Sequence, residues 1–374
     1  MEFGIPREVR EAESRVGLTP AGVLGLTQAG HTVYVQQGAG MAAGFSDEDY
    51  RQAGASIVFS AAEAYGRADV VVKVARPTAG EHTLFRSGQI VFAFFHLQVS
   101  SPDLLAALRE REITAVANEM IRDQSGQLPV LLPMSMVAGR LAPIIAGQLL
   151  MNIHGGRGTL LSGIPGVPRG SVAIVGAGTL GLHAARSFAG LGAQVLVLDR
   201  DVRQLQRVDD LLAGRVTTML ANKYTLRQVT EFVDVLVGCI QRPGQRAPKI
   251  ITRNMVKRMR PGSVIIDFSI DDGGCVETSR PTTLRDPVFV VDQVVHYCVP
   301  NVPASVARTT SYGLTNALLP YLHMLVEQGI VGMLENEPGF AYGINLYQGK
   351  LADRNLAAAL GQNVEINLPY GGSR

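Results

Sequence analysis

The stretch from Val172 to Asp199 constrains this chain more than any other. An apolar run, Val172–Val175, leads into the letters GAGTLG at 176–181, a helix-like segment follows, and a second apolar run, Val195–Leu198, ends at Asp199. A GxGxxG run between a strand and a helix, with an acid after the next strand, is typical of a dinucleotide-binding unit. The alternative is a glycine-rich turn that binds no ligand.

Four residues of this turn are expected to contact the dinucleotide. Gly176 permits the tight turn, Gly178 lets the backbone approach a pyrophosphate, and Gly181 lets the helix pack closely on the strand. Thr179 stands in the same turn, where the helix N-terminus offers unpaired N–H groups and a partial positive charge to phosphate. The glycine spacing therefore predicts a site for the phosphates of a cofactor.

The acid at the end of the second strand indicates which dinucleotide binds. Asp199 can accept hydrogen bonds from both hydroxyls of an adenosine ribose, and it repels a 2′-phosphate, so we expect NAD as the cofactor. Arg200 follows directly and could stack on the adenine. NADP is the alternative.

Composition limits the class of protein. The chain has 374 residues, of which 47% are hydrophobic and 18% are charged, so it is long enough for two globular domains. Its net charge is +2 and it has no basic block, which argues against nucleic acid and membrane surfaces as partners. Its three cysteines (Cys239, Cys275 and Cys298) are too scattered for a disulfide framework or a zinc site, so no metal is expected.

The chain shows no targeting signal. MEFGIPREVR at the N-terminus is too charged for a signal peptide, and no apolar run approaches the roughly 18–20 residues of a membrane span. Together with unpaired cysteines, this predicts a cytoplasmic protein.

Two regions alternate between apolar strands and helices, the first over the first 120 residues or so and the second from Ser171 onward. This alternation predicts an α/β fold made of two Rossmann-like, doubly wound parallel-sheet domains separated by a cleft. A long amphipathic helix, Ser311–Gln328, is expected to return to the first domain. The predicted domains are therefore 1–134 plus 305–374 for substrate and catalysis, and 135–304 for NAD.

One further helix is expected at the boundary. The segment Met136–Met151 has a helical pattern, but Pro143 falls inside it and should kink or break it.

Three positions could carry acid–base chemistry or hold an anion. His96 follows an apolar strand, Asp271 follows the strand that ends near Phe268, and Arg15 lies in the polar loop after the first strand. Ligands of open α/β sheets bind at the carboxyl ends of strands. The residues themselves leave plainer readings open, because His96 could be a strand cap, Asp271 a turn residue, and Arg15 one of several loop charges.

The chain resembles the alanine dehydrogenases, a family that also includes the soluble domain I of proton-translocating transhydrogenase. The similarity is carried by blocks in the same order along nearly the whole chain: GIPREVREAESRVGLTP at 4–20, QAGHTVYVQQGAG at 28–40, FHL at 95–97, LLPMSMVAGRLA at 131–142, GGRGTLLSGIPGV at 155–167, AIVGAGTLG at 173–181, DDGGCVETSRPTT at 271–283 and YCVPNVPASVARTTSYGLTNA at 297–317.

The resemblance implies reversible oxidative deamination of L-alanine to pyruvate and ammonium with NAD. It implies that His96 hydrogen-bonds the pyruvate carbonyl and acts as acid–base, that Asp271 helps to form and collapse the carbinolamine and imine, and that Arg15 holds the substrate carboxylate. The substrate pocket would also include Met134 and Asn301. The cofactor would touch Ser135 and the loops around Ile270 and Val299, and the family implies a homohexamer.

The chain departs from the family pattern at three positions. A KVKEP-like motif reads Lys73-Val-Ala75-Arg76-Pro here, so the substrate-binding lysine is replaced by Ala75. Lys73 lies roughly 6–7 Å further back along the strand, and Arg76 could compensate in part, although its guanidinium is a planar fork. Met136 replaces a glutamate, and Gln204 stands near a basic position of the family.

Several functions therefore stay open. The first is an NAD-dependent alanine dehydrogenase. The others are a related dehydrogenase or reductive aminase that uses a different 2-oxo acid or amine because of Ala75, an NAD-binding homologue without catalysis, and a transhydrogenase subunit, which the similarity of the C-terminal blocks disfavours. The expected partners are a small-molecule substrate and further copies of the chain.

Overall fold

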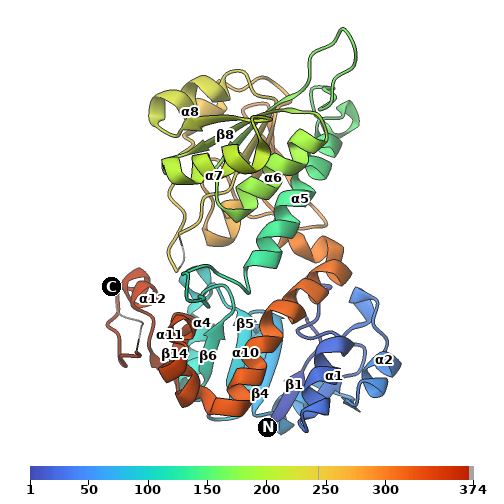
Figure 1. Ribbon diagram of the computed structural model, residues 1–374, viewed down its shortest axis with the longest axis vertical. Coiled ribbons are helices and arrows are strands. Elements are labelled where there is room, and N and C mark those ends of the chain that lie inside the picture. The colour runs from blue at the N-terminus through green and yellow to red at the C-terminus, as the bar shows by residue number, and fades with distance from the viewer. Residues whose placement is uncertain (243, 370–374) are drawn as a thin grey trace. The chain divides into compact units, whose positions relative to one another are not determined.

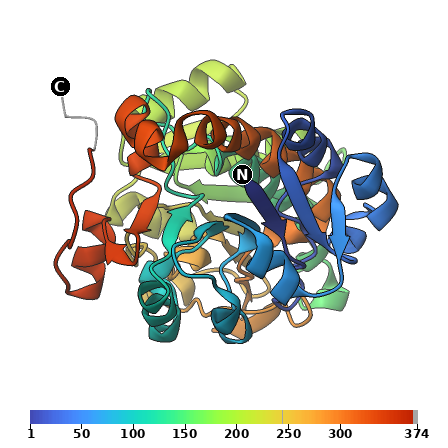
Figure 2. The same cartoon turned by 90° about the horizontal axis from the view of Figure 1, so that it is seen from below.

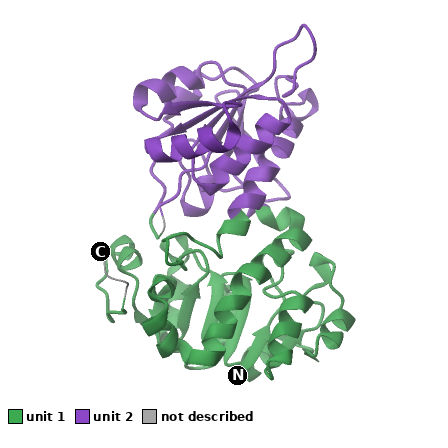
Figure 3. Ribbon diagram, viewed as in Figure 1, with its two compact units in different colours: residues 1–134, 243–245, 303–374 green, residues 135–242, 246–302 purple. Residues whose placement is uncertain are grey.

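The computed structural model describes residues 1–242 and 244–369 and divides the chain into two compact units (Figure 3). Unit 1 comprises Met1–Met134, Pro243–Gln245 and Pro303–Arg374, and unit 2 comprises Ser135–Arg242 and Arg246–Val302. Each unit has its own sheet and its own hydrophobic clusters. The cleft expected from the sequence stays a prediction.

Unit 1 is built on a sheet that, within the described residues, has eight strands in the order β15-β14-β6-β5-β4-β1-β2-β3. The six strands from the N-terminal part pair in parallel, and helices cover both faces of this sheet (Figure 2). β14 pairs antiparallel to β6, and β15 pairs antiparallel to β14. The strands are β1 (Glu2–Ile5), β2 (Thr32–Gln36), β3 (Ser56–Val58), β4 (Val70–Ala75), β5 (Ile90–Phe94), β6 (Thr114–Ala117), β14 (Ile344–Tyr347) and β15 (Lys350–Leu351).

The long helix α10 (Ala307–Asn336) completes unit 1. Its residues Leu314, Leu318, Leu322 and Leu325 are fully buried in the same cluster as the β-strand residues on one face of the sheet. Gly329 adopts φ 66°, which interrupts the helical backbone near its end. The other helices of this unit are α1 (Pro20–Gln28), α2 (Asp47–Gln52), α3 (Ala61–Arg67), α4 (Pro102–Glu110), α11 (Pro338–Ala341) and α12 (Arg354–Leu360).

Among the described residues, one helical span, Val302–Asn336, is long and apolar enough to cross a membrane by length and composition alone. This span contains no long unbroken apolar run, because polar residues interrupt its apolar positions. The buried leucines show that α10 packs its apolar face inside unit 1.

Unit 2 is built on a second sheet, which over the part of the chain that is described has seven strands in the order β12-β13-β11-β10-β7-β8-β9. All strands pair in parallel except β12, which is antiparallel to β13. The strands are β7 (Ser171–Val175), β8 (Gln194–Asp199), β9 (Thr217–Leu220), β10 (Val235–Gly238), β11 (Val264–Asp267), β12 (Val288–Val291) and β13 (Val294–Tyr297). Its helices include α6 (Thr179–Gly190), α7 (Val202–Leu212), α8 (Lys223–Thr230) and α9 (Arg253–Val256) (Figure 1).

The fold class expected from the sequence is confirmed, with three corrections. The helix around Pro143 is not broken, since α5 runs from Leu132 to Leu149 through the proline. The sequence analysis missed β13, and it also missed β14 and β15, which extend the first sheet along an antiparallel edge. These strands are short, and long-range pairing rather than a local pattern determines them.

Candidate functional site

The glycine turn of unit 2 lies at the carboxyl end of β7, where the chain enters α6. Gly176 has φ 112°, a conformation that favours glycine, and a Cβ atom there would lie 2.5 Å from the carbonyl oxygen of Cys239. At Gly181 a Cβ atom would lie 1.8 Å from the carbonyl oxygen of Gly176. These two glycines are therefore required by the packing of the turn itself.

Gly178 differs from the other two glycines. It is exposed at the N-cap of α6, its φ is −65°, and a Cβ atom placed there would meet no atom within 4 Å. The packing therefore does not require a glycine at this position. An open backbone beside the first N–H groups of a helix suits the close approach of a pyrophosphate, with Thr179 next to it.

Asp199 is held against the glycine turn. One carboxylate oxygen accepts a hydrogen bond from the Ala177 N–H at 2.7 Å, and the other accepts one from the Asp201 N–H at 2.9 Å. A carboxylate has about four lone-pair positions, so these two bonds leave acceptor capacity for ribose hydroxyls. Arg200 is exposed directly after it.

The loop after β11 forms a second part of the same sheet edge. It contains the one-turn helix η5 (Phe268–Asp272), whose Ser269 N–H donates to the carboxylate of the buried Asp267 at 3.1 Å. The Asp267 carboxylate also accepts hydrogen bonds from the N–H groups of Cys275 and Val276 at 3.0 and 3.2 Å. Asp267 was missed in the sequence analysis, although an acid at a strand end before a turn could have indicated it.

The structure brings Asp271 and Asn301 together within unit 2. Asn301 has φ 62°, and its N–H donates to the Asp271 carboxylate at 3.2 Å. Both residues are half-buried, whereas Ile270 and Val299 beside them are buried. The expected cofactor contacts therefore lie on the same loops as the expected acid–base residue.

Arg15 of unit 1 is buried and forms a two-pronged ion pair with Glu13. Its Nε and Nη2 atoms lie 2.7 and 2.6 Å from the two carboxylate oxygens, and Nη1 lies 3.2 Å from the sulfur of Met134. The structure thus joins two of the expected substrate residues, Arg15 and Met134. Glu13, which holds the guanidinium, was not singled out from the sequence.

Lys73 of β4 is fully buried between two carboxylates. Its Nζ lies 3.0 Å from Glu8 and 2.9 Å from Glu81, and the Tyr65 hydroxyl donates to Glu81 at 3.0 Å. Burial lowers the pKa of Lys73, but the two carboxylates outweigh it, and the pKa lies above its ordinary value. The ammonium is therefore committed to this network.

The two carboxylates of this network respond to burial differently. Burial raises the pKa of Glu8, and the nearby Lys73 ammonium reduces this rise without reversing it. Burial also opposes ionisation of Glu81, but Lys73 and the Thr78 N–H hold the pKa of Glu81 below its ordinary value.

Ala75 ends β4 and is buried, with 8% of its surface exposed. Neither neighbouring cation replaces the lysine that the resemblance places at position 75. Lys73 is bound to Glu8 and Glu81, and Arg76 turns toward the backbone. The Arg76 Nη1 lies 3.5 Å from the Phe95 carbonyl oxygen, and the Arg76 carbonyl accepts from Arg10 Nε at 2.9 Å.

His96 follows β5 in a left-handed backbone conformation, with φ 43° and ψ 49°. Its N–H donates to the Glu119 carboxylate at 2.6 Å, and its carbonyl accepts from the Val99 N–H at 3.0 Å. Glu119 lies just beyond β6, the strand next to β5. The sequence analysis did not single out Glu119, because nothing local marks it as a partner of His96.

The expected residues of each unit therefore gather at the carboxyl edge of that unit's sheet. In unit 1 they follow or end the adjacent strands β1, β4 and β5, and in unit 2 they follow or end β7, β8, β11 and β13. The helix α5 carries Met134, which ends the first segment of unit 1, and the half-buried Ser135, which begins unit 2. The described residues contain no group of three or more His, Cys, Asp or Glu side chains that could hold a metal ion.

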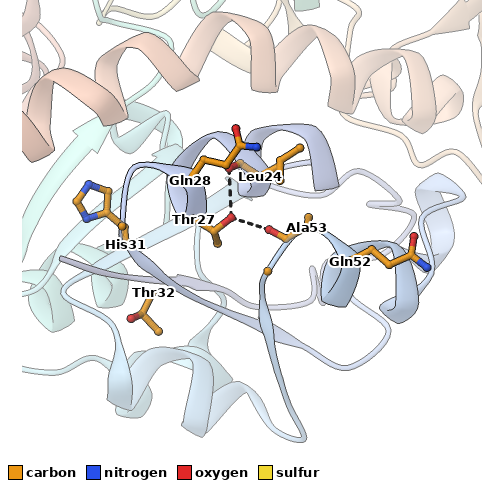
Figure 4. Close-up of a pocket in the computed structure, with 9 residues that line it drawn as sticks. Leu24, Thr27, Gln28, His31, Thr32, Gln52 and Ala53 are labelled. Atoms are coloured by element: carbon orange, nitrogen blue, oxygen red, sulfur yellow. Dashed lines mark hydrogen bonds between the residues drawn. The ribbon is translucent and has the colours of Figure 1, made fainter.

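An open hollow of about 560 Å³ lies elsewhere on unit 1 (Figure 4). Its lining includes His31 and Thr32 at the amino end of β2, together with Thr27 at the C-terminal end of α1 and Gln52 at that of α2. The Thr27 hydroxyl donates to the Ala53 carbonyl there at 2.6 Å. Because the hollow opens at the edge opposite the carboxyl ends of the strands, it is separate from the candidate site.

Comparison with protein families places the whole chain in one group. Residues 4–138 match the alanine dehydrogenase/PNT N-terminal domain, and residues 142–354 match the alanine dehydrogenase/PNT C-terminal domain. Among curated relatives, the chain is 41% identical over 371 residues to the alanine dehydrogenase of Methanococcus maripaludis, covering 99% of this chain and 98% of the relative. It is 42% identical over 361 residues to that of Mycobacterium tuberculosis, covering 96% of this chain and 97% of the relative.

Solved structures show the same similarity. A structure titled L-alanine dehydrogenase aligns with a TM-score of 0.90 and 40% identity, covering 96% of this chain and 99% of that one. The transhydrogenase from Sinorhizobium meliloti aligns with a TM-score of 0.80 over 94% of this chain, and at 24% identity it shows a shared fold only.

Proposed function

The chain belongs to the alanine dehydrogenase/PNT family, and from this membership we propose that it is an NAD-dependent alanine dehydrogenase. It would oxidatively deaminate L-alanine to pyruvate and ammonium and catalyse the reverse reductive amination. The observation that carries this proposal is the near full-length similarity to proteins named alanine dehydrogenase.

We assign cofactor binding to residues 135–304. NAD fits the turn because Gly178 leaves an open backbone at the helix N-terminus and Asp199 retains acceptor capacity for a ribose. Arg200 would lie by the adenine. Bound NAD supplies a hydride acceptor. The remaining contacts are assigned to Gly176, Thr179, Gly181, Ser135, Ile270 and Val299.

We assign substrate binding to residues 1–134 and 305–374, completed by Asn301 and Asp271. Arg15 would bind the substrate carboxylate, with Glu13 orienting its guanidinium through the bonds to Nε and Nη2. Met134, which already contacts Arg15, would border the pocket together with Ala75, Arg76 and Asn301.

His96 and Asp271 would divide the proton chemistry. Loss of hydride from the α-carbon of alanine, in its neutral amine form, leaves an iminium ion. Water attacks the carbon of this ion, and a base must take the proton that the water loses. His96 suits this task because its ordinary pKa lies near neutral pH, and it would also donate a hydrogen bond to the carbonyl oxygen of pyruvate. Asp271 would assist the formation and collapse of the carbinolamine.

The test is an assay of NADH oxidation with ammonium and a panel of 2-oxo acids. We expect turnover with pyruvate, and we expect His96→Gln to abolish it while NADH still binds. If NADH binds to the wild-type protein but no 2-oxo acid is turned over, the chain is an NAD-binding homologue without this catalysis.

A second candidate function is favoured by Ala75. Lys73 cannot take the place of the family's lysine because it is buried against Glu8 and Glu81. The chain could therefore be a related dehydrogenase or reductive aminase for another 2-oxo acid or amine. The test is to add primary amines and larger 2-oxo acids to the panel. This second function requires that one of these substrates gives a higher kcat/KM than pyruvate with ammonium.

We further propose that the protein is a cytoplasmic homo-oligomer, a hexamer by family resemblance. The support for assembly is a loop after α5 that extends from the body of unit 2 (Figure 1). Apolar side chains among residues 151–167 are exposed. The exposed fractions are 54% for Met151, 82% for Ile153, 61% for Leu160, 59% for Ile164 and 56% for Val167. Light scattering should give a mass several times the 40.0 kDa of one chain. Ile153→Asp should reduce this mass, and the control Val290→Asp, which changes an exposed residue elsewhere on unit 2, should not.

A further inference from the structure

Two successive backbone N–H groups at the end of β5 converge on one buried carboxylate. The Phe95 N–H donates to Glu119 Oε2 at 3.2 Å, and the His96 N–H donates to Glu119 Oε1 at 2.6 Å. Glu119 is 4% exposed. Successive N–H groups of this kind form a concave anion site, which here is filled by a side chain of the protein itself.

The parallel pairing of β5 and β6 brings these groups together. Ala93 and Ala117 are register partners, and the Asn118 N–H continues the ladder by donating to the Ala93 carbonyl at 2.9 Å. Phe95 and Glu119 therefore each lie two residues beyond this register pair, next to each other where the two strands end. The carboxylate reaches the next strand without any change in register.

The backbone of His96 shows what this contact does. Its φ of 43° lies in the left-handed region, which a residue with a side chain seldom adopts unless its surroundings hold it there. The Glu119 carboxylate binds the N–H of this same residue through the shorter of its two hydrogen bonds. Strained backbone of this kind concentrates at functional sites, where it is part of pre-organisation.

We propose that Glu119 is the positioning residue for His96, holding the strand end in the left-handed conformation from which the imidazole meets the substrate. This inference rests on the proposed function, in which His96 is the acid–base. Glu119 itself does not touch the substrate and acts through the two N–H groups that it binds.

The test compares Glu119→Gln with wild-type protein. A glutamine offers one acceptor oxygen, so it can satisfy one N–H group while its own NH2 faces the other. We expect kcat for pyruvate to fall about 10- to 100-fold, as for other misplaced catalytic groups, while the Kd for NADH stays within about twofold. A crystal structure of the variant should show His96 with negative φ. Glu119→Asp keeps a carboxyl group at this position, and its kcat should lie between those of wild type and Glu119→Gln. This variant replaces Glu119→Gln in the test if the glutamine protein does not fold.

Asp353→Asn is the matched control. Asp353 is also a buried carboxylate of unit 1, with 5% exposure, and it accepts hydrogen bonds from the N–H groups of Asn355 and Leu356 at 2.7 and 3.0 Å. It should lower the melting temperature without lowering kcat.

Two results would overturn the inference. One is a Glu119→Gln protein whose kcat stays within threefold of the control, and the other is a loss of kcat with the His96 backbone unchanged. If wild-type protein has no activity on any oxo acid, the proposed function is wrong, and the crystal structure of the variant still decides whether Glu119 holds the His96 backbone.

Discussion

Ala75 is the expected site residue at which the resemblance places a lysine. The residue ends β4 beside Lys73 and Arg76, and the structure commits the first of these cations to a buried ion network. A small buried side chain therefore stands where the resemblance places a charged one.

Ala75→Lys should restore alanine dehydrogenase activity if this position limits it. A charge-assisted hydrogen bond is worth about 1.5–3 kcal/mol, so kcat/KM for pyruvate should rise by about 10- to 150-fold. Ala75→Met adds comparable length without charge and should give no rise. If both variants leave all rates unchanged, position 75 lies outside the site, and a loss of activity on another substrate favours the second candidate function.

The glycines of the dinucleotide turn should respond differently to substitution by alanine. Gly178→Ala should keep a melting temperature close to that of wild type, because its Cβ atom meets nothing within 4 Å and its φ is negative. Its Kd for NADH should rise about tenfold or more, since the new methyl group occupies the approach of the pyrophosphate. Gly181→Ala should instead fail to fold normally, because its Cβ atom would lie 1.8 Å from a carbonyl oxygen. NADH titration and thermal unfolding measure both effects, and unchanged binding in Gly178→Ala would contradict the assigned site.

At the scale of elements, the buried ion network ties the loop after β1 to β4. Glu8 accepts from the Val74 N–H at 2.7 Å as well as from Lys73, and the Arg10 Nε on the same loop reaches the Arg76 carbonyl. Arg15 follows on this loop. The network therefore fixes the loop that carries the expected carboxylate-binding residue.

Lys73→Met should destabilise the protein by about 3–5 kcal/mol, because it leaves Glu8 and Glu81 buried without their cation. Arg51→Met is the control, since it breaks an exposed pair with Glu48, in which the side chains are 54% and 63% exposed, and such pairs contribute little. Urea unfolding at neutral pH measures both. Equal effects of the two variants would contradict a stabilising role of the network.

The pH dependence of the stability lost in Lys73→Met follows from the pKa of Lys73. That pKa lies above the ordinary 10.5, because the carboxylates outweigh burial. A raised folded-state pKa gives a contribution that is fully present below the unfolded value and is lost as the pH rises through the folded value. The difference between wild type and Lys73→Met should therefore persist from pH 7 to about 10 and shrink only above the ordinary pKa.

At the scale of the whole molecule, each of the four hydrophobic clusters found among the described residues belongs to one unit. Two buried clusters draw only on residues of unit 1, and two others, from Ala142 to Val302 and from Ala173 to Val294, draw only on unit 2. Each unit thus has the core that an independently folding domain needs.

A fragment of residues 135–302 should consequently fold and bind NADH without oxidising it. Its core is self-contained, and it carries the glycine turn with Asp199. A cooperative thermal transition and NADH titration test this expectation, with Gly178→Ala in the fragment as control. A fragment that folds but does not bind NADH would show that unit 1 is needed for the cofactor site.

Local chemistry made a large part of this molecule predictable. The fold class and most strands and helices of the two sheets follow from apolar runs, capping residues and glycine spacing, and the structure confirms them. The family is recognised from blocks of similar sequence along the chain, and the comparisons confirm it. The roles of the expected site residues stay predictions. The short strand β14, next to the edge strand β15, escaped the sequence analysis because its pairing with β6, more than 200 residues earlier, defines it.

The sequence by itself determined the βαβ unit around 172–199, because each requirement of that unit is met within two successive strands and the turn and helix between them. Only the tertiary structure decided which charges are already paired. Lys73 is bound to a carboxylate 65 residues away, and the His96 N–H to one 23 residues away. Such partners depend on which strands become neighbours in the sheet, and no local pattern records that choice. The dinucleotide-binding unit is therefore specified locally, whereas the surroundings of Ala75 depend on contacts between distant segments.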